Sequence, residues 1–173
     1  VVANGSLNVT RSVGKLSNLS NMLSRAPVNG CVGLGHTRWA THGGPSEANA
    51  HPHTDCTRSI AVIHNGIIEN YMPLKEFLAE NGHIFTSVTD TEVLPHLIEE
   101  ELQAFLSTPP ASARQAEAAL ADALRAVLRK VRGAYALAAI WSQAPDAIVA
   151  AKKDSPLVIG LGELENYIAS DVP

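Results

Sequence analysis

The sequence is poor in the features that mark several protein classes. Its 173 residues include two cysteines, Cys31 and Cys56, too few for a disulfide framework, so we interpret them as reduced thiols of a cytoplasmic protein. No apolar run approaches the roughly 20 residues that span a bilayer. The net charge of −4 provides no basic field for nucleic acid or anionic lipid. We therefore expect neither a membrane nor a nucleic-acid partner.

Hydrophobic residues make up 46% of the chain and charged residues 17%, which is typical of a globular protein with a substantial core. We predict a single domain over residues 1–173. A hairpin is expected over residues 1–13, because Asn4-Gly5 favours the positive φ angles of a tight turn. A helix is expected over residues 16–23 and a strand over 31–37.

Residues 41–58 are rich in glycine, proline, histidine and small polar residues, which predicts a long loop. A buried strand over 60–63 should stop at Asn65-Gly66, a strong turn dipeptide. The next helix should contain Pro73 in its first turn, bury Leu74, Phe77 and Leu78, and end at Gly82.

Two further helices are expected, each with one buried apolar stripe: Leu94, Leu97, Ile98 and Leu102 in the first, and Leu120, Leu124, Val127, Leu128 and Val131 in the second. Thr89 and Glu92 have the spacing of a capping box for the first of them, and Pro95 predicts a kink or a later start. The second should end at Gly133, and strands should follow at 134–141, 147–152 and 157–161, with another beginning at Tyr167. Strands, then helices, then strands indicate an α+β fold, with two stacked sheets and helices outside.

Three positions could carry chemistry. Arg38 stands where a strand meets the long loop, and its guanidinium matches a carboxylate, although a surface arginine beside a core tryptophan explains it equally well. Asn65 and Gly66 could supply two converging donors of an oxyanion hole, against the alternative of an ordinary turn. Asp90 could receive a substrate ammonium, although capping of the helix is the simpler explanation.

A metal site is the weaker alternative. The run His51-Pro52-His53 with Cys56 offers three ligands that zinc accepts, but it lacks a fourth. His83 and His96 are expected to face solvent without a role. We therefore predict no metal and no cofactor.

Four runs of residues together resemble a known family. They are Gly35-His36-Thr37-Arg38-Trp39-Ala40-Thr41-His42-Gly43, Asn49-Ala50-His51-Pro52-His53, His64-Asn65-Gly66-Ile67-Ile68-Glu69-Asn70 and Thr89-Asp90-Thr91-Glu92-Val93. In this order and spacing they resemble the class II glutamine amidotransferase domain of glutamine–fructose-6-phosphate aminotransferase (glucosamine-6-phosphate synthase). The resemblance implies an N-terminal-nucleophile hydrolase fold, a four-layer αββα sandwich, incomplete here at both ends.

The resemblance also implies roles for individual residues. Arg38 would bind the α-carboxylate of L-glutamine, and Asp90 would bind its α-ammonium group. Asn65 and Gly66 would form the oxyanion hole. Further substrate-binding positions are Trp39, Thr41, His42 and His51. This implied role for His51 weakens the metal alternative further.

The implied reaction is hydrolysis of glutamine, with the ammonia delivered to fructose 6-phosphate for amino-sugar synthesis. The acceptor would bind a sugar-phosphate isomerase domain of the same protein, which we expect to be a homo-oligomer. Another acceptor, or a glutamine-binding module without catalysis, is the alternative. The family nucleophile is an N-terminal cysteine, which this sequence does not contain. We therefore expect the chain by itself to release no ammonia from glutamine.

Overall fold

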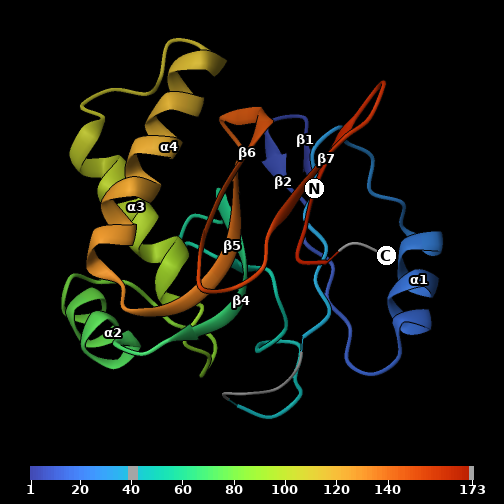
Figure 1. Cartoon of the computed structure of the whole chain (residues 1–173), viewed down its shortest axis with the longest axis horizontal. Coiled ribbons are helices and arrows are strands. Elements are labelled where there is room, and N and C mark those ends of the chain that lie inside the picture. The colour runs from blue at the N-terminus through green and yellow to red at the C-terminus, as the bar shows by residue number, and fades with distance from the viewer. Residues whose placement is uncertain (39–42, 172–173) are drawn as a thin grey trace.

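A four-stranded antiparallel sheet forms the centre of the computed structural model, which describes residues 1–38 and 43–171 (Figure 1). Its strands are adjacent in the order β3, β4, β5 and β6. Their bounds are His53–Thr54, Ile60–Ile68, Gly133–Trp141 and Ala144–Lys153. β4 and β5 pair over nine consecutive residues, from Ile60↔Trp141 to Ile68↔Gly133. This long ladder makes β4 a rigid base for the polar side chains that it carries.

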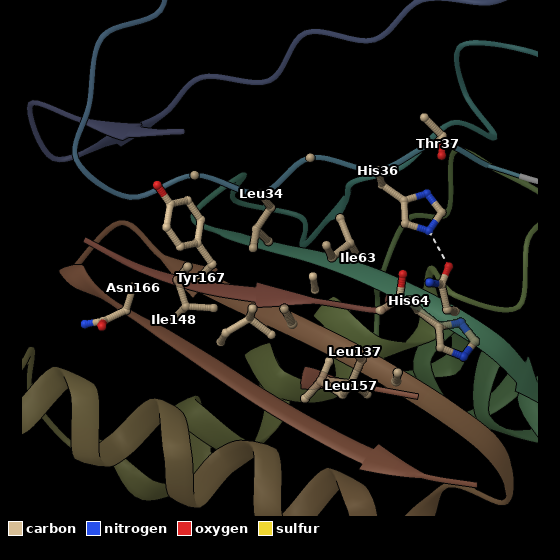
Figure 2. Close-up of a pocket in the computed structure, with 18 residues that line it drawn as sticks. Leu34, His36, Thr37, Ile63, His64, Leu137, Ile148, Leu157, Asn166 and Tyr167 are labelled. Carbon is tan, nitrogen blue, oxygen red and sulfur yellow. Dashed lines mark hydrogen bonds between the residues drawn. The ribbon is translucent and has the colours of Figure 1, made fainter. Parts of the chain in front are cut away.

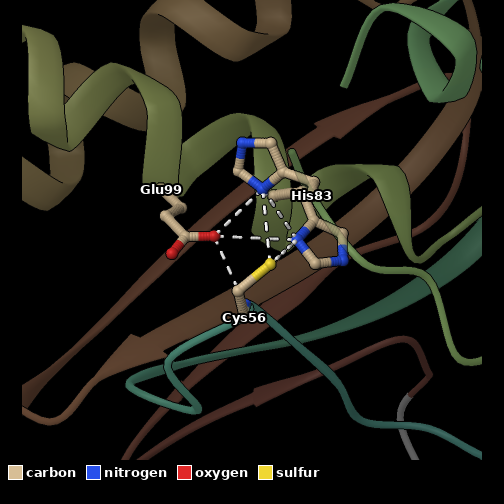
Figure 3. A group of neighbouring side chains, drawn as sticks. Cys56, His83 and Glu99 are labelled. Atoms are coloured by element: carbon tan, nitrogen blue, oxygen red, sulfur yellow. Dashed lines mark hydrogen bonds and ion pairs between the residues drawn. The ribbon is translucent and has the colours of Figure 1, made fainter. Parts of the chain in front are cut away.

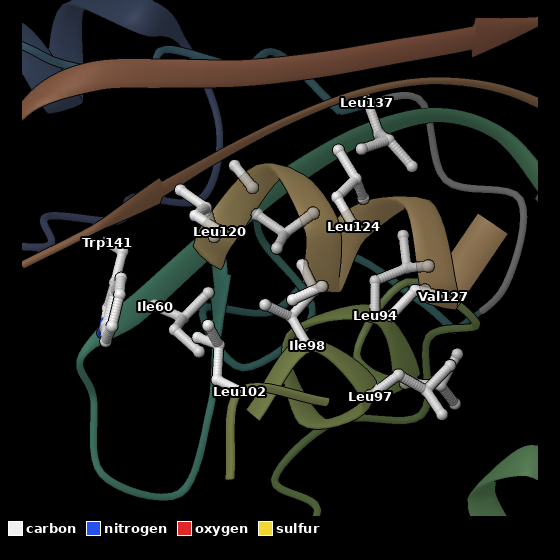
Figure 4. Packing of buried hydrophobic residues seen from close by; sticks show 14 of the residues in the cluster. Ile60, Leu94, Leu97, Ile98, Leu102, Leu120, Leu124, Val127, Leu137 and Trp141 are labelled. Carbon is white, nitrogen blue, oxygen red and sulfur yellow. The ribbon is translucent and has the colours of Figure 1, made fainter. Parts of the chain in front are cut away.

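Two helices cover one face of this sheet, and together they enclose the main core (Figure 4). They are α3 (Val93–Phe105) and α4 (Ala113–Lys130). The predicted apolar stripe of α3 is buried as expected, and so is that of α4 through Val127. Ser112 caps α4 by accepting a hydrogen bond from the Gln115 amide. Burial of one stripe per helix is what the 3.6-residue period of the sequence predicted.

The other face of the sheet is covered by extended segments. Ile140 and Ala61 pack there against Val2, with Val32 and Leu34 beside them. The hairpin of β1 (Val2–Ala3) and β2 (Ser6–Leu7) turns at Asn4-Gly5, where both residues have positive φ as predicted. A second hairpin joins β7 (Val158–Leu161) to β8 (Asn166–Ala169). The sheet is therefore covered by helices on one face and only in part by extended segments on the other, where Asn65 and Ile67 of β4 are exposed.

Across Figure 1, α3 and α4, the central sheet, the hairpins and α1 (Leu16–Arg25) follow one another from left to right. The α+β class is thus confirmed. Among the described helices, none is long and apolar enough to cross a membrane.

Two strand predictions were wrong. Residues 31–37 are extended but make one isolated bridge, Val32 to Val2, because no longer strand lies alongside for them to pair with in the described chain. Asn65-Gly66 does not end the strand, since β4 continues to Ile68. There the local turn propensity is outweighed by continuous pairing with β5.

Three helix predictions also need correction. In α2 (Tyr71–Glu80) Leu78 is buried, but Phe77 is 47% exposed. The capping box does not form, because Glu92 accepts hydrogen bonds from Thr86 and Ser87 of the preceding loop. Gly133 begins β5 instead of ending a helix. The later start that Pro95 predicted is confirmed, since α3 begins at Val93 and places the proline in its first turn, where no backbone donor is needed.

Candidate functional site

The centre of the site is the middle of β4, where Asn65 and Gly66 pair with Ala136 and Tyr135 of β5. Gly66 has φ +133°, and a Cβ atom there would lie 2.0 Å from the carbonyl oxygen of Ala134. Only glycine fits this backbone and this close approach. A glycine at position 66 therefore allows β4 to pack closely against the Ala134 carbonyl of β5. The Gly66 amide directly follows Asn65 in the sequence.

His36 holds the Asn65 side chain by a hydrogen bond of 2.7 Å between Nε2 and Oδ1. Burial lowers the pKa of His36, so the ring is neutral and one nitrogen carries the proton. The contact to an amide oxygen assigns that proton to Nε2. The Asn65 Nδ2 donor is then left for another partner. A fixed amide donor of this kind is what an oxyanion hole requires.

Asp90 lies in the loop that enters α3 and is 4% exposed. Its Oδ2 accepts a hydrogen bond of 2.8 Å from the backbone amide of Ile68, at the end of β4. Next to it, the Thr91 hydroxyl lies 2.9 Å from Nδ1 of His64. Asp90 therefore joins the helix entry to the sheet instead of capping α3, and its carboxylate is held beside the polar residues of β4.

These residues enclose a cavity of about 170 Å³, here called the polar cavity. It is lined by His36, Thr37, Arg38, His51, His64, Asn65, Gly66, Asp90 and Thr91. All five predicted site residues that the structure describes are thus brought together. An Nη of Arg38 also donates to the carbonyl oxygen of Gly43 at 3.2 Å. The other predicted binding residues, Trp39, Thr41 and His42, lie outside the described residues.

A larger cavity of about 360 Å³ adjoins the polar cavity and shares four of its lining residues: His36, Thr37, His64 and Asn65. Figure 2 shows His36 and Thr37 at one end of it, with Tyr167 and Asn166 at the other. Between them lie the apolar side chains of Leu34, Ile63, Leu137, Ile148 and Leu157. The site is therefore a polar pocket that opens beside an apolar groove.

Four histidines lie at or beside the polar cavity, namely His36, His51, His64 and, next to His51, His53, and desolvation keeps them neutral. Desolvation lowers the pKa of His51 to about 2, and the pKa values of His53 and His64 to about 4. The rings of His36 and His51 are stacked with centroids 4.2 Å apart. Nδ1 of His51 accepts a hydrogen bond of 3.4 Å from the His64 amide, and Nε2 of His53 lies 3.0 Å from the Thr89 hydroxyl. Protonating His36, His51 or His53 would place a positive charge near that of Arg38, which lowers their pKa values further.

Sequence reasoning missed part of the site. His36, His64 and Thr91 were left without roles, although each stands next to or within a run that was singled out, and that adjacency was the available signal. The three-residue zinc set of His51, His53 and Cys56 does not form. Cys56 instead contacts His83 and His96, and both of these histidines are buried, contrary to prediction. Neither cysteine lines either cavity around Asn65.

Comparisons with known proteins identify the family to which the sequence is similar. A family model described as the glutamine amidotransferase domain matches residues 36–172. The glutamine–fructose-6-phosphate aminotransferase [isomerizing] of Methanothermobacter thermautotrophicus is 50% identical over 96% of this chain, and that of Streptomyces coelicolor is 49% identical over 99%. The chain spans 26% of the length of each of these relatives.

A solved structure has a similar fold. It is the glutamine phosphoribosylpyrophosphate amidotransferase of B. subtilis, complexed with ADP and GMP, with a TM-score of 0.57 and 27% identity. The match covers 78% of this chain and 26% of that one. The fold is thus that of N-terminal-nucleophile amidotransferases. Because the family model matches most of the sequence and the described motif residues converge on one pocket, the chain belongs to the glutamine amidotransferase domain family.

Proposed function

We propose that this chain is the glutamine-hydrolysing part of a glutamine–fructose-6-phosphate aminotransferase. The observation that carries the proposal is the convergence of Arg38, Asp90, Asn65 and Gly66 on one polar cavity. A cation and a carboxylate on its wall match the two charged ends of a free α-amino acid. A pair of neutral donors in the same wall matches an amide carbonyl that becomes negatively charged during attack.

We assign Arg38 to the α-carboxylate of glutamine, because its guanidinium can donate two parallel hydrogen bonds. We assign Asp90 to the α-ammonium group. Its Oδ2 is held by Ile68, which fixes the carboxylate in place for this role. Trp39, Thr41 and His42, which follow Arg38 in the chain, are proposed to complete the substrate site. His51, neutral at physiological pH, contributes hydrogen bonding and packing instead of charge.

Asn65 Nδ2 and the Gly66 amide are proposed as the oxyanion donors. A thiolate attacks the side-chain carbonyl of glutamine, and the carbonyl oxygen becomes an oxyanion until ammonia leaves. Water then cleaves the thioester to glutamate. Neither cysteine of this sequence lines the polar cavity. We assign the described residues to binding and charge stabilisation, and the nucleophile to the N-terminal cysteine that the family resemblance implies for the whole protein.

Fructose 6-phosphate is the proposed acceptor of the ammonia, through a sugar-phosphate isomerase domain elsewhere in the protein. The support is the sequence identity of 50% and 49% to two relatives that are named for that reaction. A phosphoribosyl acceptor is the second candidate, because the structural neighbour carries that name, but its identity is 27%. Formation of glucosamine 6-phosphate by the whole protein tests the choice, and amination of phosphoribosylpyrophosphate instead would refute it.

Binding of L-glutamine to this chain tests the pocket without requiring the nucleophile. Charge-assisted hydrogen bonds contribute roughly 1.5–3 kcal/mol each, and a loss of about 3 kcal/mol weakens binding on the order of 100-fold. Arg38→Ala should therefore raise the Kd for glutamine about 100-fold in calorimetry. Arg114→Ala, an exposed arginine on α4, is the matched control and should leave the Kd unchanged. A Kd for Arg38→Ala within threefold of wild type would exclude the assignment.

A further inference from the structure

Four metal-ligating side chains converge on one point away from the polar cavity (Figure 3). This group, here called the Cys56 cluster, consists of Cys56, His83, His96 and Glu99. Cys56 lies in the turn between β3 and β4, and His83 in the connection from α2 to α3. His96 and Glu99 are three residues apart on α3 and so share a face of that helix. Three separate segments of the chain therefore meet at this cluster.

Five of the six distances between ligand atoms of the cluster are close to those between the ligands of a single tetrahedral ion, and all of these atoms lie within 4.8 Å of one another. Sγ of Cys56 is 3.6 Å from Nδ1 of His83 and 3.6 Å from Nδ1 of His96, and the two nitrogens are 3.2 Å apart. Oε2 of Glu99 is 3.2 Å and 3.7 Å from the same nitrogens. Zinc bonds of about 2.0–2.1 Å to nitrogen and oxygen and about 2.3 Å to sulfur, at tetrahedral angles, separate nitrogen pairs by about 3.3 Å and nitrogen from sulfur by about 3.6 Å.

The groups around the cluster are those that support bound metal ions. Nε2 of His83 lies 2.9 Å from a carboxylate oxygen of Glu100. A histidine that binds metal through one nitrogen commonly donates its other N–H to a carboxylate. The Ile84 amide donates to Sγ of Cys56 at 3.5 Å, which stabilises a thiolate. Without an ion, His83 would need protons on both nitrogens to donate to Glu99 and Glu100 together.

Charge and access also fit. A thiolate and a carboxylate together neutralise a divalent cation, which removes the cost of burying an isolated charge. His83, His96 and Glu99 are buried, whereas Cys56 is exposed. An ion can therefore enter from the side of Cys56 and be enclosed by the other three ligands.

We propose that the Cys56 cluster is a structural zinc site. Its mixed sulfur, nitrogen and oxygen donors at tetrahedral spacing favour Zn²⁺ among the divalent ions. Four protein ligands leave no open position, so the ion stabilises the fold and takes no part in chemistry. It fixes α3 to the turn between β3 and β4 and to the residues that follow α2.

The test is metal binding by the full chain, with Cys31→Ser as the control that removes the other, exposed cysteine. Metal analysis after zinc loading and desalting should give about one zinc ion per chain in wild type and in Cys31→Ser. Co²⁺ should give a thiolate-to-cobalt charge-transfer band and the intense visible bands of tetrahedral cobalt in both. Cys56→Ser should lose the charge-transfer band. Substituting a residue that only hydrogen-bonds to a metal ligand usually reduces metal affinity about 10–100-fold. Loss of the Cys56 thiolate, a direct ligand, should therefore weaken zinc binding by more than about 100-fold.

Thermal unfolding provides a readout that does not depend on any variant. Zinc at about 100 times its Kd should raise the Tm of wild type by about 5–10 °C relative to protein in chelator. Wild type that retains less than about a tenth of an equivalent of zinc, with no charge-transfer band on adding Co²⁺, would overturn the proposal. So would a charge-transfer band that survives in Cys56→Ser and disappears in Cys31→Ser. If Cys56→Ser does not fold, the cobalt spectra of wild type and Cys31→Ser still test the proposal, because both should show the charge-transfer band.

Discussion

Acid should destabilise this domain well before its carboxylates are protonated, because several buried histidines are held neutral. The pKa of His51 is lowered to about 2, and those of His53 and His64 to about 4, all mainly by burial. Their value in the unfolded chain is 6.5. Below that pH the unfolded state binds protons at these histidines that the folded state does not bind, so the free energy of unfolding decreases as the pH decreases.

The magnitude follows from the shifts. Between pH 7 and pH 5, each of these histidines should reduce the free energy of unfolding by about 2 kcal/mol. Because the rings lie close together, their contributions do not simply add, and we expect a total loss of roughly 3–6 kcal/mol. That is a large share of the 5–15 kcal/mol that is usual for a domain. Glu92, whose pKa is lowered by hydrogen bonds from Thr86 and Ser87, loses its contribution below pH 4.5, outside this window.

Urea unfolding followed by tryptophan fluorescence at pH 7 and pH 5 measures this loss, with a chelator present to exclude metal effects. His53→Gln keeps a polar side chain opposite Thr89 and should remove about 2 kcal/mol of the pH dependence. NMR titration of the histidine rings is the independent check. An unfolding free energy that changes by less than about 1 kcal/mol between the two pH values would refute the reasoning. So would ring resonances of His51, His53 and His64 that titrate near 6.5 in the folded protein.

Three substitutions test the oxyanion assignment and its backbone. In the whole protein, Asn65→Ala should lower kcat for glutamine hydrolysis by roughly 10²–10³ with little change in KM, and a raised KM with unchanged kcat would make Asn65 a substrate-binding residue. His36→Ala should lower kcat in the same direction but less, because it frees the Asn65 amide to rotate without removing the donor; an unchanged kcat would exclude this positioning role. Gly66→Ala should destabilise the fold by at least about 1–3 kcal/mol from its positive φ alone, with a further cost from contact with the Ala134 carbonyl. Gly44→Ala, where no atom of the described residues lies within 4 Å of the added carbon, is the control in urea unfolding, and equal stability of the two variants would contradict the steric argument.

The sequence by itself determined the local elements and the identity of the motif residues. The turn at Asn4-Gly5 depends on backbone preferences of two adjacent residues, and the buried stripes of α3 and α4 depend on spacing within a helix. Both are properties of short segments, so composition and periodicity suffice to predict them. The same holds for the family motifs, since Arg38, Asn65, Gly66 and Asp90 are recognised by their neighbours in the chain.

Only the tertiary structure decided what depends on residues far apart in the sequence. Asn65-Gly66 favours a turn locally, yet it lies within β4, because pairing with β5 along the whole strand outweighs that preference. Asp90 has capping chemistry, but its partner is the Ile68 amide, 22 residues away. Cys56, His83 and His96 are unremarkable singly, and the packing of α3 against the β3–β4 turn brings their ligand atoms together. Contacts of this kind are set by the arrangement of the core, which no local pattern in the sequence specifies.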